Sequence, residues 1–270
     1  MARIGIFDSG VGGLTVQRAL LDALPGADTI YLGDTARLPY GTKSAATVTQ
    51  YSLRSARLLE ARGIDLLVVA CNTASAVSLP AVRAHLAPVP VIGVIEPGAE
   101  AACAASSSGR IAVIATEGTV RGGAYQEAIR LRRPEAEVRA VPAPLFVALA
   151  EEGLGAGPIA EAVAHHYLDA LFAPPDGTGE ADTLVLGCTH FPMLAGAIRA
   201  AVGPGVCIVD SAETTARHVR AALAQAGLAS PGGRGGLRLL ATDAPERFAR
   251  IGARFLERPI APGEVELIDL

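Results

Sequence analysis

Hydrophobic residues fall into short apolar runs that alternate with stretches in which apolar residues recur at helical spacing. A short apolar run bounded by turn residues is typical of a strand buried on both faces, and amphipathic spacing is typical of a helix that covers such a sheet. The runs that predict strands occupy residues 3–7, 28–32, 65–69, 89–94, 110–114, 138–141, 183–186, 206–210 and 237–241. The alternation of strands with helices predicts an α/β protein with parallel sheets.

The length of 270 residues allows either one large domain or two smaller lobes. A second series of strands and helices begins near residue 96, and the C-terminal elements are expected to rejoin the first series. We therefore predict two similar α/β lobes, the first made of residues 1–95 and 210–270 and the second of residues 96–209. The chain would cross twice between these lobes, with an active-site cleft between them.

Two of the predicted strands end in similar polar motifs. Each is followed by a small residue, a thiol and two side chains that can form hydrogen bonds. The residues concerned are Cys71, Asn72 and Thr73 in the first motif and Cys188, Thr189 and His190 in the second. Because ligands of parallel α/β proteins bind outside the carboxyl ends of the strands, we expect the two thiols on opposite walls of one site.

Three further polar segments follow predicted strands. The glycine-rich turn at residues 8–13 could present backbone N–H groups to an anion, but the carboxylate of Asp8 favours a small zwitterion over a phosphate. Tyr40 and Gly41 close a loop where backbone can approach a ligand. Thr116 and Thr119 stand at the start of a predicted helix at residues 116–125 and could cradle a carboxylate. The structural alternatives are a tight turn, a packed ring and two ordinary N-caps.

The two thiols allow three interpretations, which are a disulfide, a metal site and acid/base catalysis. Cys71, Cys188, His190 and Asp8 could in principle bind zinc, but their motifs lack the close ligand spacing of structural zinc sites. Acid/base catalysis accounts for more of the neighbouring residues, because a thiol with a lowered pKa can exchange a proton near neutral pH. We therefore predict no metal and rank the metal interpretation second.

Composition and charge exclude several classes of protein. The formal net charge of -4 provides no basic stripe for nucleic acid. No uninterrupted apolar run is long enough for a membrane span, and four cysteines without a Cys-x-x-Cys pair are typical of reduced thiols. We expect a cytoplasmic protein that binds neither nucleic acid nor membrane. Pyridoxal phosphate needs a Schiff-base lysine. The only lysine, Lys43, comes just after the turn at Tyr40-Gly41 and at the start of a predicted helix, which argues against this cofactor. We therefore predict no cofactor.

Five motifs, in order and along nearly the whole chain, resemble those of the glutamate racemases. They are Asp8-Ser9-Gly10-Val11-Gly12-Gly13-Leu14, Pro39-Tyr40-Gly41, Ala70-Cys71-Asn72-Thr73-Ala74, Gly118-Thr119-Val120 and Gly187-Cys188-Thr189-His190-Phe191-Pro192. The resemblance implies two flavodoxin-like lobes and a cofactor-independent racemase that makes D-glutamate for peptidoglycan. It also implies that Cys71 and Cys188 are the two catalytic acid/base groups. We expect a homodimer.

The resemblance implies roles for further residues. Those expected to surround the substrate are Asp8, Ser9, Tyr40, Gly41, Asn72, Thr73, Thr189 and His190, together with Thr116 and Thr119. Asp8 beside Cys71 and His190 beside Cys188 are expected to orient and tune the thiols. The family usually has a serine where this chain has Gly122-Gly123, and the resemblance does not decide between Glu151 and Glu152 as the acidic residue near the site.

Two alternative functions remain open on the sequence. An aspartate racemase would share the fold and both cysteines, but those enzymes usually carry Glu at the position of His190 and lack the opening motif at residues 8–13. A non-catalytic amino-acid-binding protein would need the Asn and Thr side chains, but it would have no use for both thiols.

Overall fold

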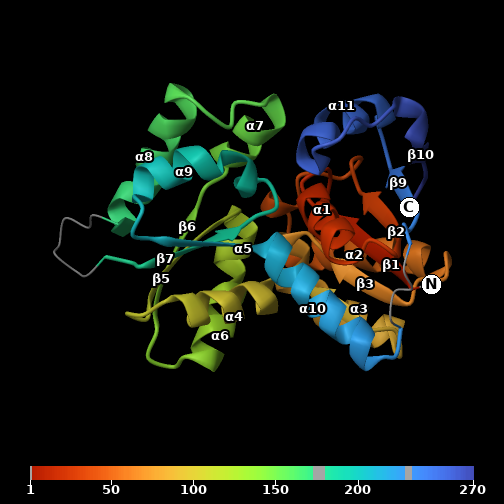
Figure 1. Cartoon of the computed structure of the whole chain (residues 1–270), viewed down its shortest axis with the longest axis horizontal. Helices are drawn as coiled ribbons and strands as arrows, with labels where there is room; N and C mark the ends of the chain where they lie inside the picture. The colour runs from red at the N-terminus through yellow and green to blue at the C-terminus, as the bar shows by residue number, and fades with distance from the viewer. Residues whose placement is uncertain (1, 173–179, 229–232) are drawn as a thin grey trace.

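The computed structural model describes residues 2–172, 180–228 and 233–270, which form two parallel sheets flanked by helices (Figure 1). The first sheet has the order β10-β9-β2-β1-β3-β4 and the second has the order β6-β5-β7-β8. The strands of the first sheet are β1 (Arg3–Asp8), β2 (Asp28–Gly33), β3 (Leu66–Val69), β4 (Val91–Gly93), β9 (Leu237–Ala241) and β10 (Val265–Leu267). Those of the second are β5 (Arg110–Ala115), β6 (Glu137–Pro142), β7 (Thr183–Gly187) and β8 (Cys207–Asp210).

Both sheets contain the same unit of four neighbouring strands, which is β2-β1-β3-β4 in the first sheet and β6-β5-β7-β8 in the second. In each unit the strand that comes second in the chain lies at one edge, followed by the first, the third and the fourth. This is the strand order of flavodoxin-like folds, in which ligands bind where the strand order reverses. The predicted fold of two similar flavodoxin-like units is therefore confirmed. The C-terminal strands β9 and β10 extend the first sheet beyond β2, while the boundaries at residues 95 and 210 remain a prediction.

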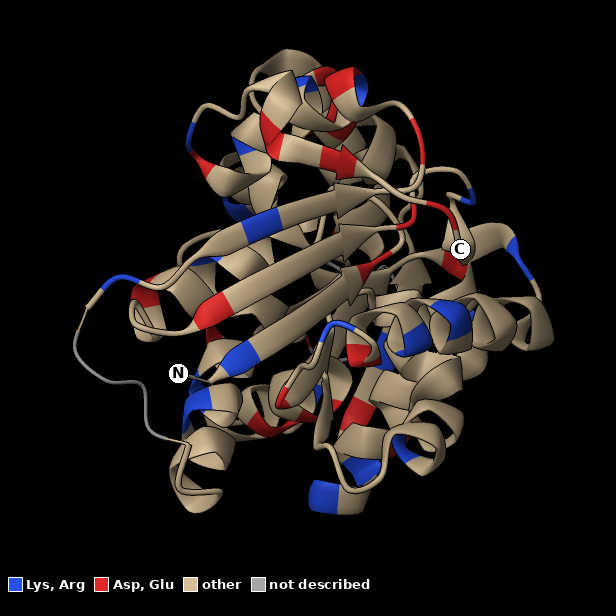
Figure 2. Ribbon diagram, turned by 90° about the vertical axis from the view of Figure 1, so that its right-hand side faces the viewer, with Lys and Arg blue, Asp and Glu red and all other residues tan. Residues whose placement is uncertain are grey.

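Strands β1, β2, β3 and β7 are apolar over most of their length and almost wholly buried. Arg3 and Asp28 are the first residues of β1 and β2, and Arg238 is the second residue of β9. Figure 2 shows neighbouring strands with a charged residue near their starting ends and mostly uncharged ribbon beyond it. The rest of β1 and β2 is buried, as are all of β3 and β7. These four strands therefore lie in the interior, and their carboxyl ends can hold polar groups without breaking the core.

Helices cover both faces of each sheet. On the first sheet, Ile4 and Ile6 pack towards α1, α10 and α11, whereas Phe7 packs towards α2 and α3. Helices α7, α8 and α9 lie on one face of the second sheet, and α4 and α6 lie on the other (Figure 1). The helices are α1 (Leu14–Ala23), α2 (Ala45–Glu60), α3 (Asn72–Leu86), α4 (Ile95–Ala105), α5 (Glu117–Gly122), α6 (Ala124–Arg132), α7 (Leu145–Glu152), α8 (Pro158–Phe172), α9 (Ala195–Val202), α10 (Ser211–Gln225) and α11 (Pro245–Leu256).

The single helix expected at residues 116–125 is wrong. Two helices, α5 and α6, replace it and meet at Gly123, whose φ of 69° is left-handed and ends the first helix. The Pro- and Gly-rich sequence of residues 174–179 predicts a flexible connection, and these residues lie outside those that the structure describes. Among the helices that the structure describes, none is long and apolar enough to cross a membrane.

Candidate active site

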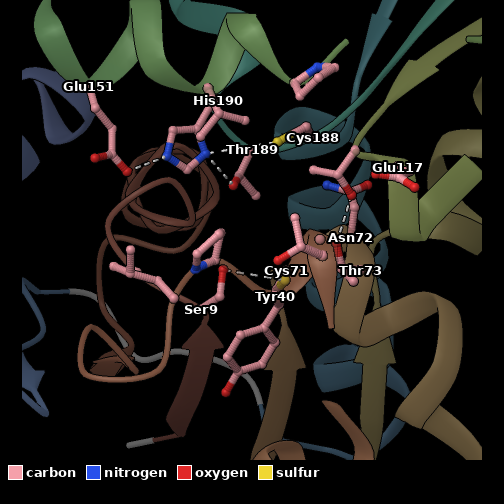
Figure 3. A pocket seen from close by; sticks show the side chains of 18 of the residues that line it. Ser9, Tyr40, Cys71, Asn72, Thr73, Glu117, Glu151, Cys188, Thr189 and His190 are labelled. Carbon is pink, nitrogen blue, oxygen red and sulfur yellow. Dashed lines mark hydrogen bonds and ion pairs between the residues drawn. The ribbon is translucent and has the colours of Figure 1, made fainter. Parts of the chain in front are cut away.

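One cavity of about 340 Å³ lies where the carboxyl ends of strands from both sheets meet. Residues that follow β1 and β3 line it on one side, and residues that follow β5 and β7 line it on the other. Of the predicted site residues it is lined by Ser9, Tyr40, Gly41, Cys71, Asn72, Thr73, Thr116, Cys188, Thr189 and His190. Figure 3 shows both thiols facing this space, so Cys71 and Cys188 line the same cavity.

Cys71 lies at the N-terminus of α3 and is almost fully buried. Its sulfur accepts a hydrogen bond from the backbone N–H of Ala74 at 3.5 Å and lies 3.6 Å from the hydroxyl of Ser9. Burial and the nearby carboxylate of Asp8 outweigh these two contacts and raise the pKa of Cys71 to about 12. Cys71 is therefore a thiol at neutral pH, which can donate a proton.

Cys188 has a different neighbour, because its sulfur lies 3.8 Å from Nδ1 of His190. The other ring nitrogen of His190 lies 3.3 Å from Glu151 Oε1 (Figure 3). Burial lowers the pKa of His190, but the hydrogen bonds with Cys188 and Glu151 outweigh burial and raise that pKa to about 10. His190 is therefore a cation at neutral pH, and a cation beside Cys188 stabilises negative charge on its sulfur.

Glu151 resolves the choice that the sequence left open between Glu151 and Glu152. Its hydrogen bond with His190 lowers the pKa of Glu151, and Arg247 of α11 contacts its second oxygen at 2.8 Å. A line of alternating charges thus runs from Arg247 through Glu151 to His190. The sequence shows the acidic pair but does not indicate that Glu151 is the carboxylate that lines the cavity at the end of α7.

Asp8 lies behind the cavity and does not line it. One carboxylate oxygen accepts from the backbone N–H of Gly10 at 2.9 Å, and the other has no partner among the described residues. Burial raises the pKa of Asp8, while the positive charge of His190 lowers it. Asp8 therefore acts on Cys71 and His190 through its charge, without a direct contact.

Three threonine hydroxyls connect the two sides of the cavity. Thr73 of α3 lies 2.9 Å from Thr116 and 3.2 Å from Thr119, and the latter two lie 3.0 Å apart. Thr119 is buried behind the other two and does not line the cavity. A set of hydroxyls that bond to one another can rotate their hydrogens toward an anion, so this cluster can receive a carboxylate.

Tyr40 contributes its ring and backbone to the cavity wall and directs its hydroxyl elsewhere. The hydroxyl donates to the buried carboxylate of Asp34 at 2.6 Å and points away from the thiols (Figure 3). Gly41 approaches Thr116 so closely that a Cβ added to it would lie 2.8 Å from the Cβ of Thr116. Glycine at position 41 is thus required by the close contact between the two walls.

The cavity has an apolar part that the sequence did not reveal. Leu38, Pro39, Pro144, Val147 and Ala148 line it beside the polar groups. These residue types also occur throughout the core, so nothing in the sequence separated them from packing residues. The described residues contain no group of three or more His, Cys, Asp and Glu side chains that could hold a metal ion.

The fold and the cavity together define a two-lobed α/β enzyme with one thiol on each wall of its site. The model of the Asp/Glu/Hydantoin racemase family matches residues 14–219, and this chain belongs to that family. A glutamate racemase from Geobacter metallireducens is 52% identical over 254 residues, which cover 94% of this chain and 92% of that protein.

Solved structures agree with this assignment. The glutamate racemase from Thermus thermophilus in complex with β-chloro-D-alanine has a TM-score of 0.87 at 44% identity and covers 100% of this chain and 97% of its own. The glutamate racemase from Francisella tularensis in complex with D-glutamate has a TM-score of 0.90 at 33% identity, with 99% and 97% covered. This chain is thus an amino-acid racemase, which is an isomerase.

Proposed function

We propose that this enzyme interconverts L-glutamate and D-glutamate with two thiols and without a cofactor. The observation that supports this most strongly is the single 340 Å³ cavity with Cys71 on one wall and Cys188 on the other. The relatives named glutamate racemase, one of them with D-glutamate bound, support glutamate as the substrate.

The chemistry consists of two proton transfers at one carbon. A thiolate takes the proton from Cα, so that a C–H bond breaks and an S–H bond forms. The thiol on the opposite face then gives its proton to the carbanion, which restores a C–H bond with inverted configuration. Each sulfur must approach Cα to within about 3–3.5 Å for these transfers.

The surroundings of the sulfurs suit this division of labour. The cationic His190 stabilises a thiolate at Cys188, whereas burial beside Asp8 keeps Cys71 protonated. For one enantiomer of glutamate, Cys188 would act as the base and Cys71 as the acid. For the other enantiomer the roles are reversed, and the substrate's ammonium group offsets part of the negative charge of Asp8.

The substrate's carboxylates need donors on both walls. We assign this role to the side chains of Asn72, Thr73, Thr116 and Thr189 and to the backbone around Gly41. All of these line the cavity. Asp8, with an unpartnered buried oxygen, supplies the negative charge that favours the substrate's ammonium group.

The product D-glutamate would supply peptidoglycan synthesis, and we propose a cytoplasmic location for the enzyme. We propose a homodimer as the functional assembly. Gel filtration with light scattering of the purified chain tests this point without reference to activity.

Incubation of the enzyme with L-glutamate in D2O tests the function. We expect D-glutamate that carries deuterium at Cα, activity that persists in the presence of a chelator, and inactivation by iodoacetamide that bound glutamate slows. Turnover of L-aspartate in preference to L-glutamate would establish the aspartate racemase instead. Binding of glutamate without any exchange at Cα would establish a binding protein.

A further inference from the structure

Asn72 lines the cavity with a buried side-chain amide, of which only the oxygen is hydrogen-bonded to other described residues. Its side-chain oxygen accepts a hydrogen bond from the hydroxyl of Tyr125 at 2.7 Å. Its side-chain nitrogen is buried and has no hydrogen-bond partner among the described residues, although Asn72 lines the cavity (Figure 3). A buried donor without a partner is costly, so this nitrogen is available for a ligand.

The orientation of this amide decides what the cavity can bind. An asparagine side chain presents two N–H donors at one end and an acceptor at the other, and the two ends have nearly the same shape. The 2.7 Å separation from Tyr125 is typical of an O–H···O bond and short for an N–H···O bond. Burial raises the pKa of Tyr125, which therefore stays protonated and donates to the oxygen.

Tyr125 is itself held tightly between the two thiol-bearing segments. It lies on α6, and its ring is fully buried. A Cβ added to Gly187 would lie 3.0 Å from the ring, and one added to Gly98 would lie 3.3 Å from it. Gly187 directly precedes Cys188, so the ring of Tyr125 packs beside one thiol segment while its hydroxyl holds the residue that follows the other thiol.

Ser211 completes the contacts of the Tyr125 hydroxyl. Its own hydroxyl lies 3.2 Å from that of Tyr125, 3.3 Å from the carbonyl of Leu186 and 3.5 Å from the side-chain oxygen of Asn72, so Tyr125 makes the shorter of the two contacts with that oxygen. The tyrosine hydroxyl thus contacts the starts of α3 and α10, and Ser211 connects it to the end of β7.

We propose that Tyr125 is a positioning residue that fixes the amide of Asn72 with its NH2 group toward the cavity, where it binds a carboxylate of the amino acid. This inference rests on the proposed function. Tyr125 would act only through Asn72, because its hydroxyl donates to the amide oxygen, at the end of the side chain opposite the NH2 group that would bind the substrate. The competing interpretation is a core tyrosine whose hydroxyl is merely satisfied.

Tyr125→Phe keeps the ring and removes the hydroxyl. We expect the KM for glutamate to rise about tenfold, because the released amide can turn its oxygen toward the substrate carboxylate. The kcat should stay within about twofold, since the thiols are not touched. The rise should be the same for L-glutamate and D-glutamate, which share the carboxylate. Tyr167→Phe is the matched control, because that hydroxyl accepts a hydrogen bond from the backbone of Leu145 outside the cavity.

A double-mutant cycle separates the proposal from a packing effect. If Tyr125 acts through Asn72, Tyr125→Phe should leave KM unchanged in a background of Asn72→Ala. A tenfold rise that persists in that background, or a wild-type KM for Tyr125→Phe alone, would overturn the proposal. Circular dichroism of each variant confirms that it is folded. Failure of the wild-type enzyme to racemise glutamate would instead refute the proposed function.

Discussion

At the scale of single residues, the two thiols occupy equivalent strand ends but have opposite electrostatic surroundings. Cys71 is buried near the carboxylate of Asp8, and its pKa is raised to about 12. Cys188 lies beside the imidazole of His190, whose pKa is raised to about 10 by its bonds with Cys188 and Glu151. The sequence shows two matching motifs, but burial and the third partner, Glu151, appear only in three dimensions.

His190 should make stability depend on pH in a defined direction. Its folded-state pKa of about 10 lies above the ordinary value of 6.5, so its stabilising charge is fully present below the ordinary value and is lost as the pH rises toward 10. We expect His190→Asn to lower the free energy of unfolding by on the order of 2 kcal/mol more at about pH 6 than at about pH 10. Urea unfolding at both pH values measures this difference.

The exposed His166 provides the control for the unfolding measurement, because His166→Asn should change the free energy of unfolding by about the same amount at both pH values. At the acidic end the sign is opposite. The pKa of Glu151 is lowered, so its contribution is present above its ordinary value of 4.5 and is lost as the pH falls through the folded-state value. A penalty for His190→Asn that grew with rising pH would contradict the ion pair.

At the scale of elements, the C-terminal end of α7 meets helix α11 at Glu151. Helix α7 ends at Gly153, whose φ of 76° is left-handed, and Arg254 of α11 donates to the backbone carbonyl of Glu151 at 3.1 Å. Arg247, also on α11, holds the Glu151 side chain at 2.8 Å. Helix α11 thus satisfies a free carbonyl of α7 and fixes the carboxylate that bonds to His190.

Arg247→Met should therefore affect catalysis more than stability. The Arg247 side chain is 45% exposed, so loss of its ion pair should cost only about 0.5 kcal/mol of unfolding free energy after solvent screening. The value of kcat/KM should fall by roughly three- to tenfold, because a looser Glu151 holds His190 less firmly. Steady-state kinetics and urea unfolding measure the two effects. Arg250→Met, an exposed arginine on the same helix, should change neither, and an equal loss in both variants would remove Arg247 from this role.

At the scale of the whole molecule, the sequence predicts the fold well because apolar runs mark buried parallel strands and the polar motifs follow them. It predicts the shared cavity for the same reason, since the carboxyl ends of the strands converge. It misses the break at Gly123, because left-handed backbone at a glycine is not visible in an amphipathic pattern. It also places Asp8 and Thr119 on the cavity wall, where the structure has them one layer behind it.

The opposite positions of the thiols lead to a final prediction. Cys71→Ser and Cys188→Ser should each reduce racemisation of glutamate by at least about a thousandfold, because a serine hydroxyl is far too weakly acidic to replace a thiolate at neutral pH. Each variant keeps one thiol on one wall, so it should still remove the α-proton of only one enantiomer. NMR in D2O should show that solvent deuterium replaces the α-proton of one enantiomer of glutamate in Cys71→Ser and of the other enantiomer in Cys188→Ser.

Cys103→Ser is the matched control for these variants, because its sulfur lies outside the cavity, 3.8 Å from the carbonyl of Ile129. It should racemise both enantiomers like the wild type. The enantiomer preference is the informative result, because it does not depend on how much activity remains. If both variants exchanged the α-proton of the same enantiomer, both thiols would act on one face of Cα. The substrate would then not lie between the two thiols in this cavity.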